Sequence, residues 1–303
     1  MGRQGTRPQA ASLRLTSSMH RRAWIQAFAG VLASGVFGYA GRCLAAAGQL
    51  QLRFNLNMTN PGPVELTAQR LWMYLPVQRN AWFRLSGIET SLTHEIQIDP
   101  LGHTILFASV ERLAAYARRS ASLIVTLERG SVPMPTVQDP QDWMAPERYI
   151  ESDDSEIITT ASALKADSTA ATVRNIHHFV AAHLEYAGYI AEDLGAAYAL
   201  RQRRGDCTEY ACLVVALCRA AGIPARMVEG FVTDRSFAPR PMDYHDWAEV
   251  LVDGHWRVVD AQKGTLFERE SQYIPFRYYR DKILNGVGSA HRYRVEGEMG
   301  FGV

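Results

Sequence analysis

The stretch that most constrains the fold is Gly205–Arg226, with the sequence GDCTEYACLVVALCRAAGIPAR. Both ends of a helix are marked in it. Asp206 is a good N-cap, and Glu209 three residues later completes a capping-box arrangement. Gly222 supplies a C-terminal stop, and Pro224 prevents the helix from resuming. Because the residues between them leave almost no polar face, the sequence predicts a helix that is buried on most sides.

The first turn of this helix carries Cys207. Unpaired N–H groups and the helix dipole favour a thiolate at a helix N-terminus, which predicts a lowered pKa for this thiol. Cys207 is therefore a candidate nucleophile. A core helix that happens to begin with a cysteine has the same sequence, so the helix alone does not decide between catalysis and packing.

A β-hairpin is predicted further along the chain. Tyr244–Val252 and His255–Asp260 are rich in β-forming residues and flank Asp253 and Gly254, a pair typical of a two-residue type I′ turn. This turn sets a register that pairs Val252 with His255, Leu251 with Trp256, Glu249 with Val258 and Trp247 with Asp260. Because side chains alternate between the faces of a strand, His245 and Asp260 then share one face as diagonal neighbours, roughly 7–8 Å apart at Cα.

Cys207, His245 and Asp260 form a credible set of catalytic groups. A carboxylate beside an imidazole can hold the ring in one tautomer while the other ring nitrogen meets a thiol. The sequence therefore predicts a nucleophile, a base and the group that orients the base. Three further residues are predicted to form part of the wall of this site: Trp247, Glu249 and Asp206.

Three separated blocks of sequence resemble a known family. They are GDCTEYA followed by RAAGIPAR, then HDWAE beginning at His245, then WRVVD ending at Asp260. In this order and spacing, over roughly residues 155–262, they resemble the transglutaminase-like superfamily. The most similar members are the bacterial transglutaminase-core proteins, relatives of the papain-like cysteine enzymes. The resemblance implies that Cys207 is the nucleophile, His245 the general base and acid, and Asp260 the third member of a triad.

The sequence departs from the family pattern at two positions. Asp246 follows the histidine where the family often has alanine, and Ala261 follows the aspartate where it often has proline. Neither replaces a reacting group, so the resemblance implies an intact triad. It also implies an α+β fold, with a papain/transglutaminase-like core in which the buried nucleophile helix packs on an antiparallel sheet. A small all-β domain often precedes such a core.

Strand periodicity predicts that β domain directly. Apolar and polar residues alternate over 50–58, a turn is marked at 61–63, and further candidates lie at 88–98, 104–110 and 123–128, giving about five or six strands. The expected organisation is an export signal at 1–47, the β domain at 48–130, a proline-rich linker at 131–154, and the catalytic core with a C-terminal extension at 155–303. The sequence gives no function for the β domain.

Three residue groups outside the triad have competing interpretations. Trp143, in the linker, either packs in the interior or forms a substrate wall. Arg226 is predicted to form a structural ion pair. Residues 170–186 are predicted to be a core helix, and its histidines lack the i, i+4 spacing of metal ligands on a helix. No metal and no other cofactor is predicted.

The first forty-odd residues indicate export. Arg21 and Arg22 precede a modestly apolar, glycine-rich run, and Ala45, Ala46 and Ala47 give a cleavage point before Gly48. Paired arginines and weak hydrophobicity resemble a twin-arginine signal. The alternative is an uncleaved membrane anchor, because the run is near the lower length of a membrane span. The expected location is periplasmic or extracellular, without stable membrane insertion once the signal is removed.

Composition indicates which kind of molecule the protein binds. The chain has 303 residues, a formal net charge of +1 and no basic tract with interleaved aromatic residues, so nucleic acid is not a predicted partner. Its 4 cysteines are too few for a disulfide scaffold. The predicted partner is a peptide or protein substrate, and the oligomeric state is not indicated.

The predicted function is that of an exported transglutaminase-like cysteine enzyme. It would carry out acyl transfer or hydrolysis at amide bonds through the triad and a thioester intermediate. One alternative is a cysteine peptidase or amidase acting on envelope or cell-wall peptides, and another is a non-catalytic binding module on the same fold. Crosslinking, deamidation and proteolysis use the same triad, so the sequence does not distinguish them.

Overall fold

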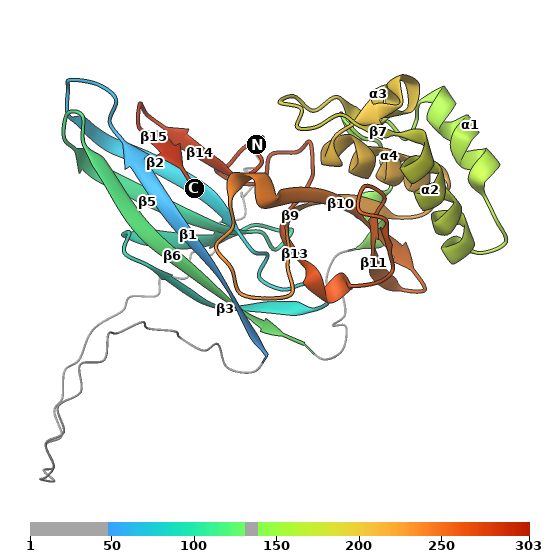
Figure 1. The fold of residues 1–303 in the computed structure, drawn as a ribbon, viewed down its shortest axis with the longest axis horizontal. Helices are drawn as coiled ribbons and strands as arrows, with labels where there is room; N and C mark the ends of the chain where they lie inside the picture. The colour runs from blue at the N-terminus through green and yellow to red at the C-terminus, as the bar shows by residue number, and fades with distance from the viewer. Residues whose placement is uncertain (1–47, 131–138) are drawn as a thin grey trace, which may run out of the picture. The chain divides into compact units, whose positions relative to one another are not determined.

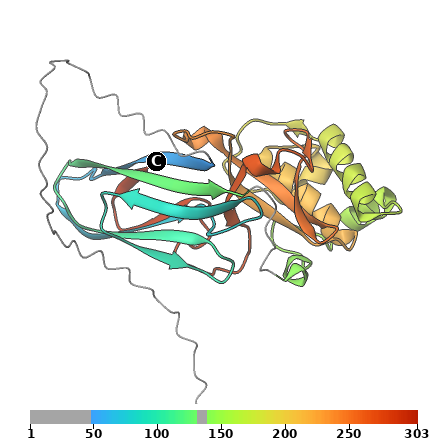
Figure 2. The ribbon, with the colours of Figure 1, turned by 90° about the horizontal axis from the view of Figure 1, so that it is seen from below.

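Two antiparallel β-sheets form the N-terminal part of the protein in the computed structural model, which describes residues 48–130 and 139–303 (Figures 1 and 2). The strands are β1 (Gln49–Thr59), β2 (Leu66–Leu75), β3 (Phe83–Thr90), β4 (His94–Ile98), β5 (Thr104–Leu113) and β6 (Arg118–Arg129). Buried apolar side chains from both sheets form one cluster, so the predicted all-β region is confirmed. The predicted export signal and residues 131–138 of the linker lie outside the described residues.

Two details of this region differ from the sequence prediction. The alternating run 88–98 is split between β3 and β4, which belong to different sheets. Strand β2 was not among the predicted candidates, because its alternation is broken. Ala68 has a φ of 52° and is skipped in the pairing of β2 with β5, and the strand then ends in consecutive apolar residues.

The last strands of the described chain return to the β domain. Strand β14 (Tyr293–Glu296) pairs with β2, and β15 (Gly300–Gly302) pairs with β1. The sheet orders are therefore β15-β1-β6-β3 and β14-β2-β5-β4. The sequence places these residues in an extension of the core, because pairing between distant strands leaves no local signal.

The described part of the core domain packs three helices and a five-stranded antiparallel sheet against a central helix, α4. The helices are α1 (Ser155–Leu164), α2 (Thr169–His183), α3 (Gly195–Gln202) and α4 (Cys207–Ala220). The sheet has the order β12-β11-β10-β9-β13, formed by β9 (Ala225–Val232), β10 (Tyr244–Val252), β11 (His255–Asp260), β12 (Thr265–Leu266) and β13 (Tyr273–Tyr278). Helix α4 contacts the other three helices as well as β9 and β10, and nearly all of its side chains are buried, as predicted (Figure 1).

Short elements connect these parts. They are the parallel pair β7 (Glu185–Tyr186) and β8 (Arg204–Gly205), and the single turns η1 (Pro140–Trp143), η2 (Pro241–Asp243) and η3 (Glu270–Gln272). The predicted helix 170–186 ends at His183, because Leu184 takes an extended conformation that leads into β7.

The β domain and the core share buried side chains. Phe231 of β9, together with Ile274 and Phe276 of β13, lies in the apolar cluster of the β domain. The described residues, 48–130 and 139–303, accordingly belong to one compact unit. Of the helices in the described ranges, none combines the length and the apolar character needed to cross a membrane.

Candidate active site

Cys207 is the first residue of α4, and the helix cap beside it is formed as predicted. The Asp206 side chain accepts a hydrogen bond from the N–H of Thr208 at 2.9 Å, and Glu209 accepts one from the N–H of Asp206 at 3.0 Å. Asp206 also accepts from the N–H of Ile190 at 2.8 Å, so both of its oxygens bind backbone amides. Asp206, predicted as a wall residue, thus fixes the helix start, and the N–H of Cys207 has no acceptor within the helix.

Gly205→Ala is expected to disturb this cap. A methyl group at Gly205 would lie 2.3 Å from Cβ of Glu209, so the capping side chain would have to move. We expect a loss of about 1–3 kcal/mol in the free energy of unfolding, measured by urea denaturation. Gly302→Ala is the control, because nothing lies within 4 Å of its added methyl group. Equal losses for the two variants would contradict the prediction.

His245 on β10 and Asp260 at the end of β11 are joined by a hydrogen bond. The observed hairpin pairs Val252 with His255, Leu251 with Trp256 and Glu249 with Val258, which is the predicted register. Asp253 and Gly254 have φ angles of 50° and 78°, as a type I′ turn requires. Nε2 of His245 lies 2.7 Å from Oδ2 of Asp260. Among the residues that the structure describes, no hydrogen bond to the second ring nitrogen, Nδ1, is formed, so Nδ1 is the atom that a thiol could approach.

Asp260 is held in place by further hydrogen bonds. The Tyr273 hydroxyl donates to Oδ2 at 3.0 Å, and the N–H of Lys263 donates to Oδ1 at 3.0 Å. Burial opposes ionisation of Asp260, but the hydrogen bonds and the charge of His245 outweigh it and lower the pKa of this carboxyl. Tyr273 is not predicted from the sequence, because β13 reaches Asp260 only through the folded sheet.

The first turn of α4 is tied to the strand that carries His245. The Thr208 hydroxyl donates a hydrogen bond to Oδ2 of Asp246 at 2.7 Å. Thr208 follows Cys207 and Asp246 follows His245, so this bond joins the neighbours of the predicted nucleophile and base. Within residues 48–130 and 139–303, the Cys207 sulfur and the His245 ring make no hydrogen bond to each other.

The pKa of the Cys207 thiol is raised, whereas the sequence predicted a lowered value. Burial is the largest cause, and the charges of Asp246 and Asp206 add to it. A hydrogen bond with the Asp246 backbone acts in the opposite direction. The helix dipole that motivated the prediction is thus outweighed by burial and nearby carboxyl groups, and a thiolate here depends on a cationic partner such as the His245 imidazolium.

The sequence of this region matches a known family. Residues 158–261 match the family model of the transglutaminase-like superfamily. We name residues 158–261 the transglutaminase-like domain, after the family model that they match. It contains Cys207, His245 and Asp260, and the predicted resemblance is confirmed for the domain as a whole.

Two solved structures are similar to this chain. A candidate cysteine protease from Cytophaga hutchinsonii is 18% identical, with a TM-score of 0.58, and the match covers 84% of this chain and 90% of that chain. The periplasmic domain of TgpA from Pseudomonas aeruginosa is 17% identical, with a TM-score of 0.36, over 65% of this chain and 88% of that chain. Among curated proteins, the search found no match. The first of these similarities supports the α+β fold.

The two remaining predicted wall residues of the transglutaminase-like domain, Trp247 and Glu249, are both buried. Trp247 is 1% exposed, and its ring centroid lies 6.3 Å from that of His245 and 5.1 Å from that of Tyr273. Glu249 Oε2 lies 2.5 Å from Nη2 of Arg226, which gives the ion pair predicted for that arginine. The described part of the chain has no group of three or more His, Cys, Asp or Glu side chains able to hold a metal ion.

Aromatic rings surround the Arg226 guanidinium. Its carbon Cζ lies 4.2 Å from the Trp256 ring centroid, 4.0 Å from that of Tyr278 and 5.5 Å from that of Trp143. Trp143 is fully buried in this cluster, which supports interior packing over a substrate wall.

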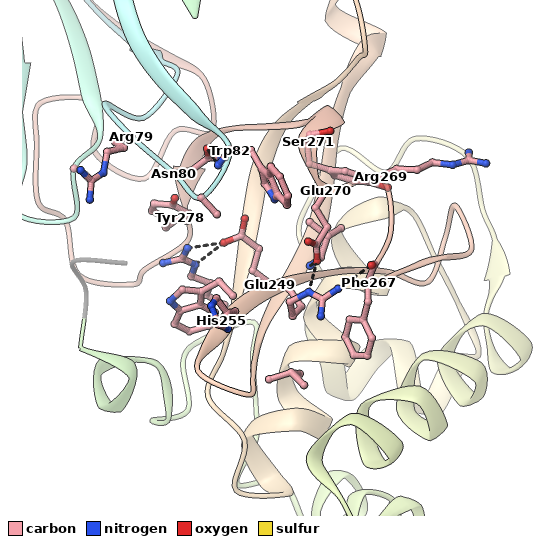
Figure 3. Close-up of a pocket in the computed structure, with 18 of the residues that line it drawn as sticks. Arg79, Asn80, Trp82, Glu249, His255, Phe267, Arg269, Glu270, Ser271 and Tyr278 are labelled. Carbon is pink, nitrogen blue, oxygen red and sulfur yellow. Dashed lines mark hydrogen bonds and ion pairs between the residues drawn. The ribbon is translucent and has the colours of Figure 1, made fainter. Parts of the chain in front are cut away.

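A pocket of about 1260 Å³ opens beside the ion pair of the transglutaminase-like domain (Figure 3). Its walls come from the β domain, with Asn80 and Trp82, and from the core, with Glu249 and Tyr278. Tyr273 also lines it, whereas Cys207 and His245 do not. The pocket therefore borders Tyr273, a hydrogen-bond partner of Asp260, and is not lined by the thiol.

Proposed function

We propose that this protein is an exported cysteine enzyme that transfers the acyl group of an amide bond in a peptide or protein. The observation that carries the proposal is the 2.7 Å hydrogen bond from His245 to Asp260, formed on a strand that is tied to the helix bearing Cys207. The predicted roles are nucleophile for Cys207, base and acid for His245, and orienting carboxylate for Asp260.

The proposed reaction proceeds through a thioester. The Cys207 thiolate attacks the amide carbonyl carbon, and the N–H at the start of α4 is placed to stabilise the negative oxygen that forms. The carbon–nitrogen bond then breaks, and the His245 imidazolium gives its proton to the leaving amine. A second nucleophile attacks the thioester, passes its proton to His245 and releases the Cys207 sulfur.

The second nucleophile decides which activity results. Water gives hydrolysis or deamidation, and a primary amine gives crosslinking. The Cytophaga hutchinsonii protein of the same fold is described as a candidate cysteine protease, which supports hydrolysis as the first activity to assay. Export follows from the predicted signal at 1–47 and is part of this proposal.

One observation favours a second candidate, a non-catalytic binding module. Cys207 is mostly buried and the pKa of its thiol is raised, as expected of an inert cysteine. The pairing of His245 with Asp260 argues for the enzyme, because an imidazole held by a carboxylate is the partner that such a thiol needs.

Thiol alkylation distinguishes the two candidates. The rate of reaction with iodoacetamide is measured against pH for the wild type, His245→Ala and Cys207→Ala, the last giving the background from the other cysteines. The enzyme proposal expects reaction of Cys207 well below the ordinary thiol pKa of about 8.5, and loss of that reaction in His245→Ala. Labelling that is unaffected by the histidine at every pH supports the binding module.

A further inference from the structure

Asp246 is a buried carboxyl group next to both predicted reacting residues. It follows His245 on β10, is 6% exposed, and accepts the 2.7 Å hydrogen bond from Thr208 on its Oδ2 atom. Its Oδ1 atom is fully buried and has no hydrogen-bond partner among the residues that the structure describes. An ionised carboxylate needs several donors when it is buried, and this one has a single hydroxyl.

A second carboxyl group lies directly across the sheet from Asp246. The β9–β10 ladder pairs Asp246 with Glu229, which is fully buried. Glu229 forms an ion pair with Arg277, and its Oε2 atom lies 3.2 Å from Nδ1 of His291. Nε2 of His291 lies 3.2 Å from Asp193, so two cationic side chains are matched by two carboxylates. The charge of His291 lowers the pKa of Asp246, but burial and the charge of Glu229 raise it by more.

Other ionisable side chains lie around Asp246. They include Glu229 on β9, Arg277 on β13, His291, Arg292 and Asp193 in loops, Asp206 and Cys207 at the start of α4, and Tyr244 and His245 on its own strand. Asp206 differs from Asp246 because both of its oxygens accept backbone N–H groups. Burial and the charge of Glu229 raise the pKa of Asp246 well above its ordinary value.

We propose that Asp246 is a positioning residue that must remain a neutral carboxylic acid for Cys207 to act as a nucleophile. When Asp246 loses its proton, a negative charge forms beside the sulfur, and the proton of the His245 imidazolium returns to the thiolate. The ion pair then becomes a neutral thiol and imidazole, with no change in bonding elsewhere. This inference rests on the proposed function and gives the enzyme an upper pH limit set by Asp246.

The backbone and the side chain of Asp246 have opposite effects on Cys207. The backbone N–H of Asp246 favours the thiolate, whereas its ionised side chain would oppose it. One residue therefore supports the nucleophile at low pH and suppresses it at high pH.

The test is the pH profile of Cys207 alkylation in the wild type, Asp246→Asn and Asp243→Asn. The wild-type rate is expected to fall by at least about 10-fold on the alkaline side, because one nearby charge shifts a thiol pKa by a unit or more. The alkylation rate of Asp246→Asn should not decrease on the alkaline side. Asp243→Asn, which removes a charge from the exposed pair with Arg240, should retain the decrease. Superimposable profiles for the wild type and Asp246→Asn would overturn the inference.

Thr208→Val provides a second, milder variant should Asp246→Asn fail to fold. Its hydroxyl favours the ionised form of Asp246, so its removal should move the alkaline fall to higher pH. If the alkylation rate of Thr208→Val falls at the same pH as that of the wild type, the inference is overturned.

Infrared spectroscopy of the wild type adds a readout without a substrate, since a buried carboxylic acid gives a C=O band that disappears over the same pH range. If His245→Ala does not change the alkylation of Cys207, the proposed function itself is refuted. Failure of the proposed function can therefore be distinguished from failure of this inference.

Discussion

Replacing Asp260 with asparagine is expected to slow turnover of an amide substrate by about 10⁴-fold, the loss seen when a triad aspartate becomes asparagine in a serine protease. Asparagine fills the same space but presents an N–H or a neutral oxygen to Nε2 of His245, which changes the tautomer and removes the charge that stabilises the imidazolium. The measurement is kcat/KM with whichever peptide or amine donor proves active.

Tyr273→Phe is the matched control for this prediction. It removes one 3.0 Å hydrogen bond to the same carboxylate oxygen but keeps the charge and the ring packing. We expect a much smaller loss of kcat/KM. Activity of Asp260→Asn within tenfold of the wild type would show that the carboxylate does not serve His245.

Glu249→Gln is expected to destabilise the protein by about 3–5 kcal/mol, because it leaves the buried Arg226 charge without this carboxylate. The two side chains are only 5% and 9% exposed, so water cannot replace the lost partner. Urea denaturation followed by tryptophan fluorescence measures the change, since Trp256 packs against the arginine.

Glu296→Gln gives the comparison at the surface. Its pair with Arg70 is about half exposed, with side-chain exposures of 47% and 53%, and such pairs contribute less than about 1 kcal/mol. A small effect of Glu249→Gln on stability, together with a raised KM, would instead favour the predicted role of Glu249 in the substrate wall.

The features predicted correctly are those specified by neighbouring residues. Asp206 and Glu209 are three residues apart, and the capping box needs nothing else. The two-residue turn at Asp253 and Gly254 sets the hairpin register, and the register brings His245 to Asp260. The candidate triad could therefore be read from local rules and a recognisable spacing.

The features that were missed depend on the folded environment. The Tyr273 hydroxyl reaches Asp260 from a strand that joins the sheet on the far side of β9. The pKa of Cys207 is raised by burial and by three carboxyl groups that folding brings together, and the sequence shows neither cause. The helix dipole, which favours a lower pKa, can be inferred from the sequence. Asp246 was noticed only as a departure from the family pattern, because its burial opposite Glu229 becomes visible only in the sheet.

The return of β14 and β15 to the β domain has a consequence for the order of folding. Strands β1 and β2, near the start of the described chain, obtain these partners only after residues 293–302 have been synthesised. Until then, part of one edge of each sheet has unpaired backbone groups that can pair with another molecule. A product cut before Tyr293 would keep both edges open, so proteolytic loss of a short tail would promote self-association while leaving every group of the candidate triad in the chain.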